Sequence, residues 1–163
     1  MAQRRVVTGL DRDGKSCVIF DDNGGMAGHG GRTMLFWRST AAPASNEGTK
    51  DAADEPSSFV FDPGATKFVT VRFPPGTKPA MHTTNTLDYG ILLEGQVTLV
   101  LEAGEVVLRK GDLIIDRGVA HGWRNDGPED ALILWTIVDA KPVGKGEDIA
   151  SLGHDFGKPA AKK

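Results

Sequence analysis

Two histidines and one aspartate, separated along the chain, could meet in one site. His82 lies in PAMHTT, Asp88 follows in NTLDYG, and His121 lies in GVAHGW. Two histidines and a carboxylate that project into one cavity match the facial set of non-haem Fe(II) sites, which leaves coordination positions open. The same histidines would also suit a buried position in which their ring nitrogens bond to the backbone. Residue type and spacing alone leave both interpretations open.

The neighbours of these residues are read from strand alternation. In extended strands, Thr84 shares the face of His82, and Trp123 shares the face of His121. Thr84 and Trp123 are therefore expected to contact a ligand or cofactor in a shared cavity, although Trp123 could instead pack in the core.

Three further residues near the site have alternative roles. Tyr89 is expected to point away from Asp88, in a packing role. Arg72 and Arg124 could clamp a carboxylate or form surface salt bridges.

Residues 59–141 carry the pattern of an all-β barrel or sandwich. Short β-branched and aromatic runs alternate with Gly, Pro and Asp turn signals at regular spacing. The predicted strands cover residues 68–73, 90–93, 97–101, 106–108, 113–115 and 131–138. No convincing long helix is predicted. We therefore expect an antiparallel, jelly-roll-like barrel.

The flanking segments differ in composition from this core. Residues 1–58 are predicted to be an N-terminal extension, within which residues 39–58 (STAAPASNEGTKDAADEPSS) have no apolar periodicity and should form a flexible insertion. Residues 142–163 are predicted to be a C-terminal tail.

Composition excludes several classes of partner. The 163 residues carry 19 Lys and Arg against 22 Asp and Glu, a net charge of −3, so no basic field would attract nucleic acid or anionic lipid. One cysteine cannot form an internal disulfide, and no targeting segment or membrane-spanning run is visible. These features predict a cytoplasmic protein with a small-molecule ligand and with neither a nucleic-acid nor a membrane partner.

Two segments of the core resemble the two signature motifs of the cupin superfamily, in the right order. The first contains a glycine, a histidine, an acidic residue and a glycine in register: Gly76, His82, Asp88 and Gly95. The second contains two glycines, a histidine and an asparagine: Gly111, Gly118, His121 and Asn125. The segments HTTNTLDYG and RGVAHGWRN further resemble those of small single-domain cupins of mostly unassigned activity.

The resemblance implies a divalent metal, because cupins typically hold Fe, Mn, Ni or Zn through three histidines and a glutamate. Carried over residue by residue, the metal ligands would be His82, Asp88 and His121. Thr84 stands where the second family histidine is expected, and Asp88 replaces the glutamate. Ordinary bond lengths leave an aspartate oxygen roughly 1.5 Å short of a glutamate oxygen, so metal-bound and metal-free sites both stay open.

The function that this resemblance implies is that of a small-molecule enzyme. With a metal, it would act on an oxygenated organic acid or carbonyl compound by oxygenation, decarboxylation, isomerisation or dehydration, as a dioxygenase, lyase or isomerase. His82, Asp88 and His121 would be its catalytic residues. The alternatives are a metal-free His/Asp acid–base isomerase and a non-catalytic binding or sensing module. Related cupins often pair their N-terminal strands, which implies a homodimer.

Overall fold

The computed structural model describes residues 3–54, 57–58, 61–146, 148–149 and 155–156. Within them the chain is built of β-strands and short 3₁₀ segments, with no α-helix, so the all-β prediction is confirmed. The first elements are β1 (Arg5–Leu10), β2 (Ser16–Asp22), β3 (Met26–Gly28), the 3₁₀ turn His29–Gly31, β4 (Thr33–Ser39) and β5 (Ser57–Ser58). The others are β6 (Thr66–Phe73), β7 (Thr86–Glu94), β8 (Gln96–Leu101), β9 (Gly104–Arg109), β10 (Leu113–Asp116), β11 (His121–Arg124), β12 (Ala131–Asp139) and β13 (Asp155–Phe156).

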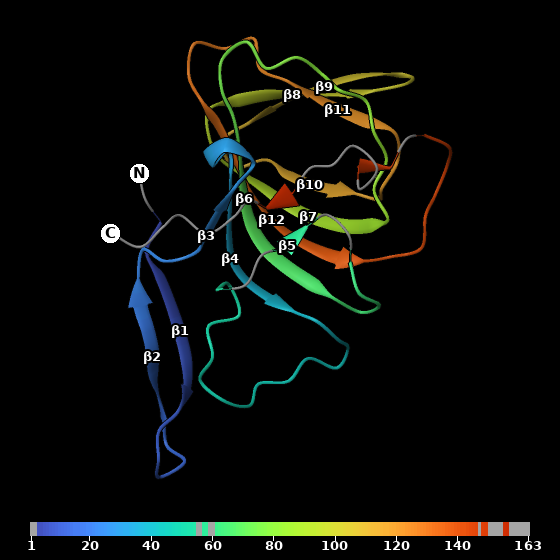
Figure 1. The fold of residues 1–163 in the computed structure, drawn as a ribbon. Coiled ribbons are helices and arrows are strands. Elements are labelled where there is room, and N and C mark those ends of the chain that lie inside the picture. The colour runs from blue at the N-terminus through green and yellow to red at the C-terminus, as the bar shows by residue number, and fades with distance from the viewer. Residues whose placement is uncertain (1–2, 55–56, 59–60, 147, 150–154, 157–163) are drawn as a thin grey trace.

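Two antiparallel sheets enclose the interior. A six-stranded sheet has the order β10-β7-β12-β6-β4-β3, and a three-stranded sheet has the order β11-β8-β9. Figure 1 shows the three-stranded sheet lying across one side of the larger sheet. The fully buried side chains Leu35, Val69, Leu92 and Ile133 lie on the larger sheet, and Val97 lies on the smaller one. Burial of these side chains between the sheets drives the closure.

The N-terminal segment contributes to the main sheet. β4 pairs with β6 along its length, and β3 pairs with β4 at the sheet edge. The apolar alternation of β4, which buries Leu35 completely, explains why this strand packs on the core. The segment expected to be an extension therefore supplies two strands of the larger sheet.

The β1–β2 hairpin projects away from the two sheets (Figure 1). Its attachment depends on Arg5, which is buried and hydrogen-bonds Asp22, Asp51 and the Phe36 carbonyl oxygen. Residues 40–50 are exposed, whereas Ala53 packs in the core. The loop predicted to be flexible is thus tied at one end to the hairpin and the core. In the C-terminal segment 142–163, residues 147, 150–154 and 157–163 lie outside the described residues.

Candidate functional site

The two predicted histidines lie side by side. His82 and His121 exchange two backbone hydrogen bonds of 2.9 Å, and their ring centroids are 4.4 Å apart. In each ring, Nδ1 lies 2.8 Å from a backbone carbonyl oxygen two residues earlier, that of Ala80 or Val119. Because a carbonyl oxygen can only accept, Nδ1 carries the proton in both rings and Nε2 is the basic nitrogen. The ring nitrogens of both histidines therefore bond to the backbone, while both side chains also line the cavity described below.

His121 has a second partner, which the sequence did not reveal. Asp116 Oδ2 lies 3.1 Å from His121 Nδ1, and both side chains are buried. The other oxygen of Asp116 accepts a hydrogen bond of 2.9 Å from the Gly118 amide. Asp116 stands two residues before Gly118 of the second motif. The burial of Asp116 at the end of β10 follows the alternation from Ile114, and that alternation was the available signal.

Asp88 is a buried carboxyl with an unsatisfied atom. It pairs in register with Asp116 across β7 and β10, so two carboxyls face the interior from adjacent strands. Burial, and secondarily the charge of Asp116, raise the pKa of Asp88 to about 7. The Thr86 hydroxyl opposes this rise, although neither Thr86 Oγ1 nor Asp88 Oδ1 makes a hydrogen bond of good geometry within the described residues. At neutral pH, a large fraction of Asp88 is therefore protonated.

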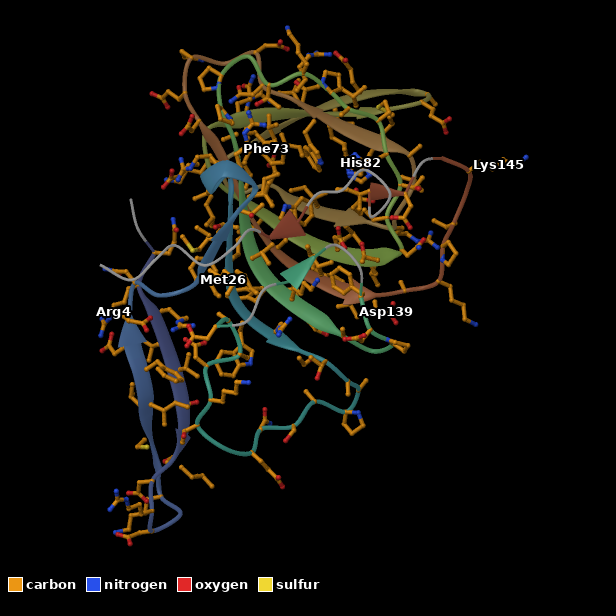
Figure 2. All side chains as sticks on the ribbon, in the orientation of Figure 1. Arg4, Met26, Phe73, His82, Asp139 and Lys145 are labelled. Atoms are coloured by element: carbon orange, nitrogen blue, oxygen red, sulfur yellow. The ribbon has the colours of Figure 1, made fainter. Side chains whose placement is uncertain are left out.

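These residues share one cavity of about 230 Å³ between the sheets. Phe73 and His82 both line this cavity, and Figure 2 shows them at separate places along it. The cavity is lined by Arg32, Thr33, Val71, Arg72, Phe73, Thr77, Lys78, Ala80, His82, Thr84, Asp88, Asp116, His121, Trp123, Trp135, Ile137 and Ile149. This volume suits a ligand smaller than a drug-sized molecule.

Aromatic rings form one wall of the cavity. Trp123 is buried and lies 5.4 Å from Phe73, 5.7 Å from Trp135 and 5.9 Å from His121, measured between ring centroids. Trp123 thus packs in the core and also lines the cavity, and its contact with a ligand stays a prediction. Thr84 also lines the cavity, and its buried Oγ1 has no hydrogen-bond partner within the described residues.

The remaining candidates separate by location. Tyr89 is 48% exposed, opposite the buried Asp88, as alternation predicted. Arg72 lines the cavity and bonds Asp130 at 3.0 Å. Arg124 forms exposed ion pairs with Glu105 and Asp126.

The predicted metal ligands are not gathered around a common point. Nowhere in the described ranges are three His, Cys, Asp or Glu side chains placed to hold one ion. His82 and His121 are neighbours, whereas Asp88 comes from β7 of the larger sheet and lies opposite Asp116. As placed, His82, Asp88 and His121 do not fit a three-ligand metal centre.

Sequence comparison places this architecture among known proteins. Residues 69–137 match the cupin domain model. Over 148 residues, the chain is 33% identical to a cupin-domain-containing oxidoreductase of Neurospora crassa, srdB, and the match covers 85% of this chain and 74% of that protein. The chain belongs to the cupin family. The recognition made from the two motifs is thereby confirmed.

Other relatives extend the comparison. Phomopsin biosynthesis cluster protein D of Diaporthe leptostromiformis is 33% identical over 141 residues, which cover 79% of this cupin and 74% of that protein. Among solved structures, the Cnp3 cupin domain of Schizosaccharomyces pombe matches 83% of this cupin and 87% of its own chain, with a TM-score of 0.51 and 13% identity. This structural likeness supports the cupin fold. No helix in the described part of the chain has the length and apolar character to cross a membrane.

Proposed function

We propose that this cupin is a small-molecule enzyme that acts on an oxygenated organic acid or carbonyl compound inside the barrel. Relatives named as oxidoreductases support an enzymatic role. The observation that carries the proposal is the buried Asp116–His121 pair, at 3.1 Å, on the wall of a cavity. The Val119 carbonyl oxygen lies 2.8 Å and the Asp116 carboxylate 3.1 Å from His121 Nδ1, so the Nδ1 proton faces acceptors and Nε2 is available as a base.

The step that these residues support is proton transfer next to a carbonyl. His121 Nε2 takes a proton from the carbon beside the carbonyl, and the electrons of that C–H bond form a C=C bond. The carbonyl π electrons move to oxygen, which takes the proton of the Asp88 carboxyl. In an unsaturated substrate, the protonated His121 returns the proton to the γ-carbon, the C=O bond re-forms, and the enol oxygen gives its proton back to Asp88. This completes an isomerisation without any oxidant.

The two carboxyls have separate roles in this step. Asp88 is the acid, because burial raises the pKa of its carboxyl to about 7 and the carboxyl therefore keeps its proton at lower pH. Asp116 is a positioning residue, because it contacts His121 and the Gly118 amide and holds the ring in one tautomer. The neighbouring His82 ring packs on His121 and restricts its rotation.

An Asp116→Asn variant tests this assignment. A panel of keto and hydroxy acids is incubated with the protein, and their conversion is followed by mass spectrometry. Loss of the carboxylate should lower kcat roughly 10²- to 10⁴-fold with little change in KM, because the ligand does not depend on Asp116 for binding. An unchanged kcat in a correctly folded variant contradicts the proposal.

A metal-dependent alternative would require Asp88 to move toward His82 and His121, and one observation supports it. Metal-ligating histidines commonly donate their second ring nitrogen to a carbonyl or carboxylate, as both His82 and His121 do. Elemental analysis of protein purified without added metal, repeated for His82→Ala and His121→Ala, tests this version. Stoichiometric Fe, Mn, Ni or Zn that is lost in both variants would support it.

Two broader expectations belong to the same proposal. Ligand binding without conversion of any acid in the panel would favour the binding or sensing alternative.

The compartment expected from sequence is the cytoplasm. A homodimer is supported by the projecting β1–β2 hairpin, because an isolated hairpin is only marginally stable and Val6, Leu10 and Val18 are exposed on it.

A further inference from the structure

The cavity contains buried hydroxyl and carboxyl oxygens without partners. Thr33 Oγ1, Thr84 Oγ1 and Asp88 Oδ1 make no hydrogen bond within the described residues, and all three side chains line the cavity. Their residues are 3%, 7% and 9% exposed, respectively. A buried polar atom without a partner costs free energy, so its presence on a cavity wall indicates a ligand atom that completes the bond.

These oxygens lie at two different levels of the larger sheet. Register through β4, β6, β12 and β7 places Thr33 level with Leu92, whereas Asp88 lies four residues earlier on β7. Four residues of strand correspond to about 13 Å along the strand direction. The cavity therefore has one polar end at Thr33 and another at Asp88, where Thr84 and His121 also lie.

The Thr33 end is cationic. The exposed Arg32 and Lys78 and the half-buried Arg72 line the cavity. Arg32 adjoins Thr33 in the chain, and its carbonyl oxygen accepts a hydrogen bond of 2.7 Å from the Arg72 amide. Asp130 compensates one of these charges through Arg72. The opposite end holds the carboxyls and imidazoles, so the cavity is electrically asymmetric along its length.

The wall between the two ends is aromatic. Trp123 is the centre of this wall, because its ring lies next to the rings of Phe73, Trp135 and His121. Stacked or tilted rings favour a flat, unsaturated ligand.

We propose that the substrate is a flat, unsaturated organic acid that binds lengthwise, with its carboxylate at Thr33, Arg32 and Lys78 and a second oxygen at Thr84, Asp88 and His121. The orientation rests on the proposed function only in taking the His121 end as the reacting end. The Thr33 hydroxyl donates to the carboxylate, and the two cations neutralise its charge. The second oxygen is a carbonyl or hydroxyl, which the Asp88 and Thr84 side chains can reach.

A matched pair of probes tests this orientation. 4-Acetylbenzoate has a carboxylate and a carbonyl at opposite ends of a ring, and 4-acetylbenzamide has the same shape without the charge. Binding is measured by ligand-observed NMR titration. The wild-type protein should bind the acid at least tenfold more tightly than the amide.

Variants locate the charge preference. Arg32→Gln, Lys78→Gln and the near-isosteric Thr33→Val should each weaken binding of the acid several-fold and leave binding of the amide within twofold. Arg124→Gln is the control, because Arg124 forms exposed ion pairs with Glu105 and Asp126, and it should change neither affinity.

Two results separate this inference from the proposed function. Equal affinity for acid and amide, or equal loss of both in the three variants, overturns the orientation even if the protein converts other compounds. Selective binding of the acid, with no conversion of it or of any acid in the panel, supports the orientation and contradicts the proposed proton transfer.

Discussion

Asp116 and the Val119 carbonyl oxygen together determine which nitrogen of His121 can act as a base. Its carboxylate and the Val119 carbonyl oxygen both lie within hydrogen-bond range of His121 Nδ1, and neither can donate a proton to it. The basic nitrogen is therefore Nε2, and a base held in this way is a common element of proton-transfer sites.

This assignment predicts the tautomer of both histidines. In ¹⁵N-labelled protein above pH 8, where imidazoles are neutral, His82 and His121 should show the Nδ1–H form by NMR. Free imidazoles in water favour the Nε2–H form, so the shift is diagnostic. An Nε2–H signal from His121 contradicts the role given to Asp116.

The buried carboxyl of Asp88 predicts an unusual dependence of stability on pH. Its pKa is about 7 in the folded protein and about 4 when unfolded, so the folded state binds more protons between these values. The free energy of unfolding should therefore fall as pH rises from 4 to 7 and level off above 7. Asp88→Asn should be more stable than wild type at pH 8, by up to about 4 kcal/mol.

Urea denaturation at pH 4, 6 and 8 measures this effect. Asp13→Asn is the matched control, because Asp13 is exposed and should leave the curve within about 0.5 kcal/mol of wild type. A variant Asp88→Asn with the same pH dependence as wild type would show that Asp88 ionises normally.

At the scale of elements, glycines near the turns hold the strands in register. Gly118 and Gly111 both have positive φ, of 76° and 94°, but their surroundings differ. A Cβ on Gly118 would overlap the Thr84 carbonyl oxygen, whereas no heavy atom lies within 4 Å of a Cβ on Gly111. Gly118 thus lets the Asp116–His121 segment pass closely beside the segment that carries Thr84.

The pair provides a prediction with a built-in control. Gly111→Ala should cost about 1–2 kcal/mol, the strain of a left-handed backbone alone. Gly118→Ala should cost at least about 2 kcal/mol more, because backbone must also move. Chemical denaturation measures both values, and equal costs would show that the close approach at Gly118 is relaxed without penalty.

Much of the barrel could be predicted because its strands are long apolar runs bounded by turns. β6, β7, β8, β9, β10 and β12 all contain a predicted run. β11 was not predicted, because HGWR has only one large apolar side chain and owes its position to pairing with β8. β4 contains an apolar stretch, but its partner β6 lies more than 25 residues away, and local pattern does not reveal such pairing.

The site was predictable in its members but not in its geometry. His82, Thr84, Asp88, His121 and Trp123 do line one cavity. Asp116 was missed because its contact with His121 depends on the turn at Gly118, which brings the end of β10 back toward β11. The metal hypothesis came from residue types and from family resemblance, and neither carries information on how a shorter aspartate is placed.

At the scale of the whole molecule, exposed apolar surface predicts self-association. Tyr89, Leu113 and Ile115 are 48%, 73% and 59% exposed, and register places Ile115 directly beside Tyr89 on the outer face of the larger sheet. Light scattering coupled to size exclusion should show a dimer. Leu113→Asp should shift the dimer toward monomer. Leu10→Asp, on the projecting β1–β2 hairpin, should do the same. A monomer at 0.1 mM wild-type protein would contradict the homodimer.

The proton transfer assigned to His121 can be observed directly as deuterium exchange. 4-Acetylbenzoate is incubated in D₂O with chelator-treated protein, and loss of the acetyl methyl signal is followed by NMR. Wild-type protein should exchange these protons faster than buffer, and His121→Gln, with an unchanged circular dichroism spectrum, should exchange them no faster than buffer. Equal exchange by both proteins, or exchange by wild type only after metal is restored, would contradict the role of His121 as the base.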